Sequence, residues 1–173
     1  MVDPKRVAQG KKNRTSGKQF EVRVRKDLEE KDWIVDRWTN NIEFYYPLGE
    51  IELKKQIGKT FNGPREVGRI IPAKAKWNNF TKSMIMGSGG FPDFIAFKQT
   101  IQRFEKKEGC HLWMYRVIGV ECKINGTLTA LEKQKCRWYL DNNIFSKIFI
   151  AEKTKVKNKI VIVYHDFKEK YGK

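Results

Sequence analysis

The chain has 173 residues, with 36 Lys or Arg against 20 Asp or Glu, a formal net charge of +16 and a pI of about 9.8. This length suits one compact domain and is too short for two of ordinary size. The charge favours a polyanionic partner, nucleic acid or an acidic membrane surface. Because the sequence has no apolar run near the roughly 18 residues that a membrane span needs, we expect nucleic acid and no membrane.

The first fifteen residues are polar and basic and show no apolar periodicity. We therefore expect residues 1–15 to form a flexible basic arm, which either contacts DNA or serves as a disordered solubilising tail. The same stretch lacks the apolar core of a secretory signal. The sequence predicts a cytoplasmic protein, located in the host cytoplasm if it is viral.

A helix and a strand are predicted next. Ser16 and Gln19 match a capping box, and three apolar residues spaced by four follow, which predicts a helix over about 17–31. The β-branched and aromatic stretch 34–38 predicts a short strand. Residues 39–90 mix strand-like pieces, at 43–46 and 50–54, with prolines and glycines. We interpret them as an insertion that carries a hairpin or two within a single domain, 16–173.

The rest of the chain predicts more strands and one more helix. Alternating apolar residues indicate strands at 91–98, 115–123, 147–153 and 159–167. Thr129 and Glu132 form a second capping-box signature, which predicts a helix to about Asn142. The expected fold is therefore α/β, with a central mixed β-sheet flanked by helices and an insertion after the first strand.

Two of these strands carry an acid in line with core-facing positions. Asp93 is in phase with Phe91 and Ile95, and Glu121 follows Gly119 on one face. A buried carboxylate is costly unless it is paired or binds a cation. If the two strands are neighbours, both acids lie at the same end of the sheet, where their oxygens suit Mg²⁺ or Mn²⁺.

Lys123 lies two residues after Glu121, so the two side chains share a strand face. Its ammonium group can orient an attacking water or stabilise charge on phosphorus. The alternative without a catalytic role is a simple Glu–Lys ion pair. Cys122 points to the other face, but its backbone carbonyl is a candidate metal ligand.

The pattern Pro92-Asp93 followed by Glu121-Cys122-Lys123 resembles the PD-(D/E)XK nuclease superfamily. Within it, the chain is similar to archaeal-type Holliday junction resolvases and virus-type replication-repair (VRR-NUC) nucleases. The resemblance implies a restriction-endonuclease-like αβββαβ core, one or two divalent cations per site, and hydrolysis of DNA phosphodiester bonds by water.

Two further positions agree with this resemblance. Glu21 borders the apolar stripe of the first helix and matches a metal-holding glutamate of those nucleases; an ion pair with Arg25 is its structural alternative. Gln134 lies between Leu131 and Trp138 on the predicted inner stripe of the second helix and matches a glutamine near their metal site. A surface glutamine is the alternative there.

The leading hypothesis is a metal-dependent DNA endonuclease that acts on branched or junction DNA, with a restriction-type or other repair nuclease as the alternative. Glu21, Asp93, Glu121 and the Cys122 carbonyl are the expected metal ligands, and Glu21, Asp93, Glu121, Lys123 and Gln134 the expected catalytic set. The expected DNA-binding residues are basic: Lys11, Lys12, Arg14, Lys18, Arg37, Lys74, Lys76 and Lys82. A non-catalytic DNA-binding protein is the alternative of a different class.

By analogy with enzymes that cut symmetric junctions, we expect a homodimer. No nucleotide cofactor is expected, because the IGKT segment at 57–60 has Leu53 where a phosphate-binding loop needs its first glycine.

Overall fold

The structure is a computed structural model that describes residues 4–45, 67–73, 75–78, 83–86, 90–100 and 114–172, with the backbone alone described for 4–6, 75–78 and 83–86. The chain divides into two compact units. The first unit joins Met1–Trp38 to Phe91–Lys173, and the second is Thr39–Gly90, the range that the sequence suggests to be an insertion.

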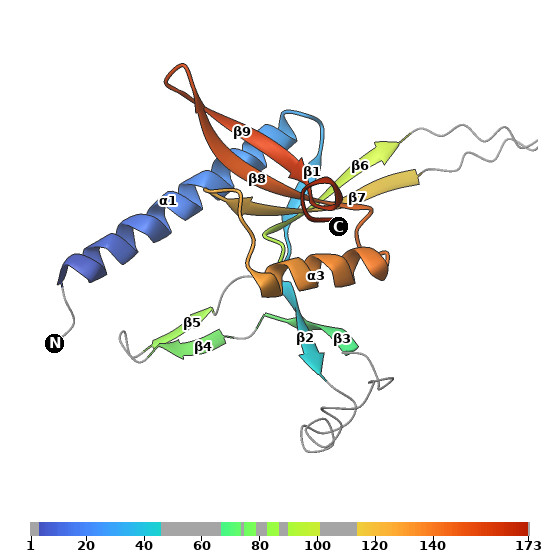
Figure 1. Cartoon of the computed structure of the whole chain (residues 1–173), viewed down its shortest axis with the longest axis horizontal. Helices are drawn as coiled ribbons and strands as arrows, with labels where there is room; N and C mark the ends of the chain where they lie inside the picture. The colour runs from blue at the N-terminus through green and yellow to red at the C-terminus, as the bar shows by residue number, and fades with distance from the viewer. Residues whose placement is uncertain are drawn as a thin grey trace, which may run out of the picture. The chain divides into compact units, whose positions relative to one another are not determined.

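A mixed sheet of five strands forms the centre of the first unit (Figure 1). In spatial order its strands are β1 (Ile34–Arg37), β6 (Phe94–Thr100), β7 (Met114–Lys123), β8 (Lys147–Val156) and β9 (Lys159–Asp166). β7 and β8 are parallel, and the other neighbouring pairs are antiparallel. Parallel neighbours need a crossover connection, which here contains the helix α3 (Ala130–Asp141). The predicted α/β class, mixed sheet and strands are confirmed, with ends that differ by a few residues.

The first helix, α1, is longer than the sequence analysis predicts, because it runs over Pro4–Glu29. The flexible arm expected at 1–15 is therefore wrong from residue 4 onward, and Ser16 lies inside the helix rather than at its start. Proline suits the first helical position. The residues that follow are mostly Lys, Arg, Gln and Ala, which favour helix, with no further proline before the sheet.

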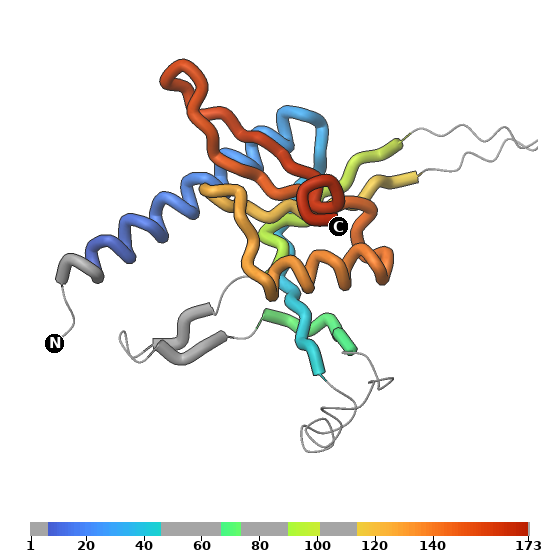
Figure 2. The backbone as a smooth tube through the Cα atoms, in the orientation of Figure 1, coloured from blue at the N-terminus to red at the C-terminus, as the bar shows by residue number. Residues whose placement is uncertain are grey.

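The apolar stripe of α1 packs on one face of the sheet. Phe20, Val24 and Leu28 are buried there with Ile118 and Val120 of β7 and with residues of β1, β6 and β8. Figure 2 shows β1, which follows α1 in the chain, running beside β6 from much later in the sequence. Because side chains alternate along a strand, residues 119, 121 and 123 of β7 face away from α1, toward the side that α3 covers.

A capping box begins α3, as predicted. The Thr129 side chain accepts a hydrogen bond from the backbone N–H of Glu132, and the Glu132 carboxylate accepts one from the Thr129 N–H at 2.7 Å. The inner face of α3 is formed by Cys136, Tyr139 and Leu140. The predicted inner stripe through Leu131 is wrong, since Leu131 is 52% exposed.

Removing this cap should destabilise the protein. We expect Thr129→Ala to lower the free energy of unfolding by about 1 kcal/mol, because the backbone N–H of Glu132 loses its side-chain acceptor and the Glu132 carboxylate loses the Thr129 hydroxyl. Urea denaturation followed by circular dichroism measures the change. Thr127→Ala is the control, since the Thr127 hydroxyl donates to the Asn125 carbonyl and not to the helix. An equal loss in both variants would contradict a specific capping role.

The second unit consists of two pairs of antiparallel strands in its described part, β2 (Asn40–Tyr45) with β3 (Val67–Pro72) and β4 (Ala75–Asn78) with β5 (Ser83–Met86). The strand-like piece at 43–46 is largely β2, whereas the one at 50–54 lies outside the described residues. The sheet of the first unit is followed by a short helix that the sequence analysis misses, α4 (Phe167–Tyr171). None of the helices in the described ranges has the length and apolarity that a membrane span requires.

Candidate active site

Asp93 and Glu121 lie side by side, because the strands that hold them are neighbours. β6 and β7 pair with Phe94 opposite Val120, which places Asp93 just before β6 next to the last residues of β7. The backbone N–H of Asp93 donates to Oε2 of Glu121 at 3.1 Å. In return, the backbone N–H of Cys122 donates to Oδ2 of Asp93 at 2.8 Å. Each acid is thus held by the backbone of the other's strand.

Gly119 lets the segment that carries Asp93 pack closely against β7. The Phe91–Pro92 peptide bond is cis, and Phe91 and Pro92 are both buried. A Cβ atom on Gly119 would lie 2.8 Å from Cγ of Pro92, well inside van der Waals contact. The absence of a side chain at position 119 therefore allows Pro92, and with it Asp93, to reach its place beside Glu121.

Both acids are strongly affected by burial. Glu121 is 5% exposed, and burial, reinforced by the nearby Asp93 charge, raises its pKa to about 8 although Lys123 acts in the opposite direction. Burial also raises the pKa of Asp93 to about 6, against the lowering effect of the Cys122 N–H and with a raising effect from Glu21. Two carboxylates held this close repel each other when both are ionised.

Lys123 lies between two glutamates. Its Nζ atom is 2.9 Å from Oε1 of Glu121 and 2.6 Å from Oε1 of Glu132 on α3. Burial lowers the pKa of Lys123, but the Glu121 and Glu132 carboxylates outweigh it and raise the pKa above its usual value. Lys123 is therefore a cation fixed at the edge of the acidic pair. Its Glu132 partner is a site residue that the sequence analysis recognises only as a helix cap.

Glu21 approaches the pair from α1 but is bound to Arg37 at the end of β1. Oε2 of Glu21 lies 2.8 Å from the Arg37 guanidinium group, and the charges of both residues affect the pKa of Asp93. The alternative partner Arg25 instead pairs with Glu29 at 2.8 Å. Arg37, expected to bind DNA, thus makes an internal ion pair beside the candidate site.

No protein-family model, curated protein or solved structure matches the chain.

The carboxylates suit a divalent cation, but the expected ligand set is not brought together as a whole. Among the described residues, no group of three or more His, Cys, Asp or Glu side chains is arranged to hold a metal ion. Asp93 and Glu121 do fit one, because hard cations prefer carboxylate oxygens and a positive charge between two buried acids would offset their repulsion. The Cys122 side chain packs with the α1 face of the sheet, and metal binding by its carbonyl stays a prediction.

The other residues predicted to act in catalysis or DNA binding lie outside the acidic pair. Gln134 is half-buried on α3, two residues beyond Glu132, and a catalytic role for it stays a prediction. The helix α1 carries four of the basic residues on its exposed surface, Lys11, Lys12, Arg14 and Lys18. Lys74 and Lys82 lie outside the described residues, and Lys76 belongs to β4, of which only the backbone is described.

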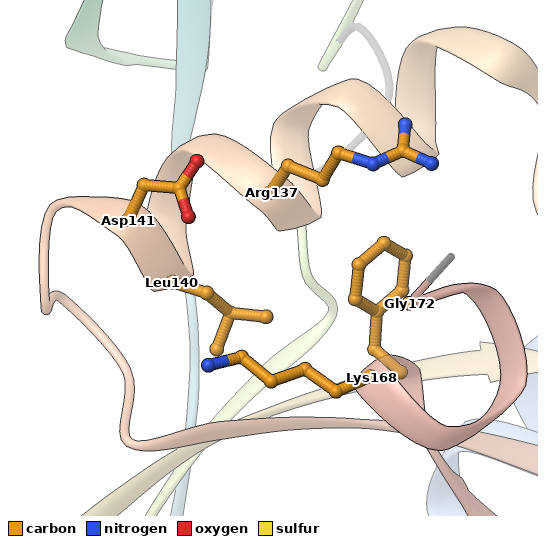
Figure 3. Close-up of a pocket in the computed structure, with 6 residues that line it drawn as sticks. Arg137, Leu140, Asp141, Lys168 and Gly172 are labelled. Carbon is orange, nitrogen blue, oxygen red and sulfur yellow. The ribbon is translucent and has the colours of Figure 1, made fainter.

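A separate pocket of about 280 Å³ lies between α3 and α4 (Figure 3). Arg137, Leu140 and Asp141 line it from α3, and Phe167, Lys168 and Gly172 line it from the end of the chain. Figure 3 shows Leu140 and Lys168 extending into the space between the two helices. The pocket contains neither acid of the pair and uses the half of α3 farther from Glu132, so it is not part of the candidate active site.

Proposed function

We propose that this chain is a divalent-metal-dependent endonuclease that hydrolyses phosphodiester bonds in DNA. The observation that carries the proposal is that the buried carboxylate of Glu121 and the half-buried carboxylate of Asp93 are each bonded to the other's neighbouring backbone, with an ammonium group 2.9 Å from Glu121. Two neighbouring acids shielded from water in this way are costly for a fold. Metal-assisted hydrolysis gives the arrangement a use.

Asp93 and Glu121 would hold the cation, Mg²⁺ or Mn²⁺. When bound, the cation would activate water and neutralise charge on the attacked phosphate. Lys123 supplies a fixed positive charge that stabilises the negative charge developing on phosphorus. Glu132 is a positioning residue, because its carboxylate holds Nζ of Lys123 from the α3 side. Glu21 would join the ligand set through its carboxylate, whose Oε2 accepts from Arg37, because metal-binding carboxylates are commonly hydrogen-bonded to other groups.

The order of elements supports the same proposal. Leaving out the unit Thr39–Gly90, the chain runs α1, β1, β6, β7, α3, β8, the order of the restriction-endonuclease-like αβββαβ core that the motif implies. The net charge of +16 suits a nucleic-acid substrate. Branched or junction DNA, cut by a homodimer in the cytoplasm, is the specific form of the proposal, and a restriction-type or other repair nuclease is its variant.

Cleavage assays with labelled four-way junction, flap, single-stranded and linear duplex DNA test this proposal. With Mg²⁺ or Mn²⁺ the protein should cut at least one of these, and EDTA should stop the reaction. Asp93→Asn should bind the same DNA without cutting it, because an amide keeps the bond from the Cys122 N–H but loses the charge that a cation needs. Cleavage that persists in EDTA or in the variant would refute the proposal.

A non-catalytic DNA-binding protein is the second candidate, and two ion pairs favour it. Lys123 is closer to Glu132 than to Glu121, and Glu21 is already paired with Arg37, so the polar groups satisfy one another without substrate or metal. In that case wild type and Asp93→Asn bind DNA equally and neither cuts any substrate with any metal.

A further inference from the structure

The first half of α1 extends past the sheet without packing on it. Among the helix residues whose side chains are described, which begin at residue 7, Phe20 is the first buried one, and residues 7–15 are all exposed. A Cβ atom on Gly10 or Gly17 would meet nothing within 4 Å. Figure 1 shows this part of the helix running away from the strands of its own unit. Burial of apolar side chains therefore does not explain residues 7–15, which we call the extension.

The charge of the extension has one sign. Between Pro4 and Phe20 the helix holds six basic residues and no acidic residue; the six are Lys5, Arg6, Lys11, Lys12, Arg14 and Lys18. None of the ion pairs among the described residues involves Lys11, Arg14 or Lys18. Basic groups near a helix N-terminus oppose the helix dipole, and glycine inside a helix disfavours it. Bound anions would offset both effects.

Helical spacing aligns part of this charge with the candidate active site. Lys11, Arg14, Lys18 and Glu21 follow one another at intervals of three, four and three residues, so they form a single row on one side of α1. Glu21 is the member of the row whose charge affects Asp93. From Lys11 to Glu21 the row is about 15 Å long, at a rise of about 1.5 Å per residue. That length matches about four base pairs of duplex DNA.

We propose that Lys11, Arg14 and Lys18 form a phosphate track, which binds the sugar–phosphate backbone of duplex DNA and leads it along α1 to the candidate active site. DNA is the partner because its negative phosphates complement the positive charge of the track. The proposal rests on the proposed function only in taking DNA as the ligand, and it does not require that the protein cleaves DNA. The extension contacts phosphates, which position DNA without reading its sequence. DNA binding then stabilises a helical segment that has little packing of its own.

If the track binds DNA, the loss of affinity should depend on the side of α1 from which positive charges are removed, and not only on their number. Arg14→Gln/Lys18→Gln removes two positive charges from the track. Arg23→Gln/Lys26→Gln removes two from a different side of the same helix, since Arg23 lies five residues after Lys18, a rotation of about 140°, and Lys26 is on the side of Arg23. All four residues are exposed, and glutamine keeps a good helix propensity, so both variants should fold as the wild type does.

Fluorescence anisotropy with a labelled 30-base-pair duplex in EDTA, over a series of salt concentrations, measures binding without cleavage. We expect the track variant to bind at least about 10-fold more weakly and its salt slope to fall by about 1.8, the value for two lost phosphate contacts. The control variant should keep the wild-type slope. Hydrogen exchange should show amides of residues 8–19 gaining protection on DNA binding in the wild type.

Equal losses in the two variants would overturn the track, because the effect would then be one of net charge. The absence of an effect in the track variant, or of DNA binding by the wild type, would overturn it as well. If the wild type binds through the track but cuts no DNA with Mg²⁺ or Mn²⁺, the track stands and the nuclease proposal fails.

Discussion

Replacing Glu121 with glutamine should reduce DNA cleavage by a factor on the order of 10²–10³, the range found when one preorganised charged or polar group is lost from an active site. The same change should make the metal-free protein less sensitive to alkaline pH. Both effects have one cause. Glu121 is almost fully buried beside Asp93, so its negative charge is useful to a bound cation and costly to the fold without one.

The direction of the pH effect follows from proton linkage. The pKa of Glu121 rises from an ordinary value of 4.5 to about 8 on folding, so the folded state holds this proton more tightly than the unfolded state. The associated stability is complete below about pH 4.5 and is lost as the pH rises to about 8. Asp93, with a pKa of about 6, adds a loss of the same sign. Glutamine cannot ionise, so the variant lacks the Glu121 part of this loss.

Urea denaturation in EDTA at pH 5 and pH 8 checks this expectation. The stability of Glu121→Gln relative to the wild type should rise between the two pH values by several kcal/mol at most, since each pKa unit corresponds to about 1.4 kcal/mol. Glu132→Gln is the control, because its effect on stability at pH 8 should have the opposite sign. Burial raises the pKa of Glu132, but its bonds to Lys123 and Thr129 lower it more. Its charge therefore stabilises the fold at pH 8, and the variant should be less stable there than the wild type.

Divalent cations give a further test of the same site. At pH 8, Mg²⁺ or Mn²⁺ should raise the melting temperature of the wild type, because a ligand that binds only the folded state stabilises it. Glu121→Gln should show a much smaller increase. An equal increase in both proteins would place the cation elsewhere.

The sequence predicts the acidic pair well because its physical basis is local. Asp93 and Glu121 each interrupt a strand pattern, and a period of two suffices to assign Glu121 and Lys123 to one face. The sequence brings the two acids together only on the condition that their strands are neighbours, and the antiparallel pairing of β6 and β7 fulfils this condition.

The sequence predicts partners less well, since these depend on which elements meet in space. Arg37 and Glu132 contact Glu21 and Lys123 from other elements of the fold, and no periodicity within one element indicates such a pair. The capping box of α3 does contain a usable signal, because Glu132 binds Thr129 through one oxygen and Lys123 through the other.

The main wrong prediction about the fold is the start of α1, which the sequence analysis predicts near residue 17 and which lies at Pro4. A polar segment without an apolar stripe is predicted to be disordered, because most helical stability in proteins comes from packing. Residues 7–15 lack that packing even in the helix. Two other factors favour helix in these residues: their intrinsic helix propensity, and the packed helical turns at Phe20 and Val24, from which the helix continues. Apolar periodicity indicates neither factor.

Substituting Gly119 by alanine should impair the site without touching a charged group. The added methyl carbon would lie 2.8 Å from the Pro92 ring and 3.3 Å from the Phe145 ring, and neither buried ring can move aside as the end of a flexible side chain would. Overpacking of this kind costs about 1–3 kcal/mol of stability. Relief of the contact moves Pro92 away from β7, and Asp93 moves with it.

The expected result is a lower melting temperature together with a loss of cleavage on the order of 10²-fold, because a misplacement of about 1 Å has an effect of this size in active sites. Cleavage is measured well below the melting temperature of the variant, so that unfolding does not account for the lost activity. Gly10→Ala is the stability control, since its methyl group meets nothing within 4 Å and alanine favours helix. If Gly119→Ala retains full activity and stability, close packing of Pro92 on β7 does not hold Asp93 beside Glu121, and the reciprocal backbone bonds must hold the pair alone.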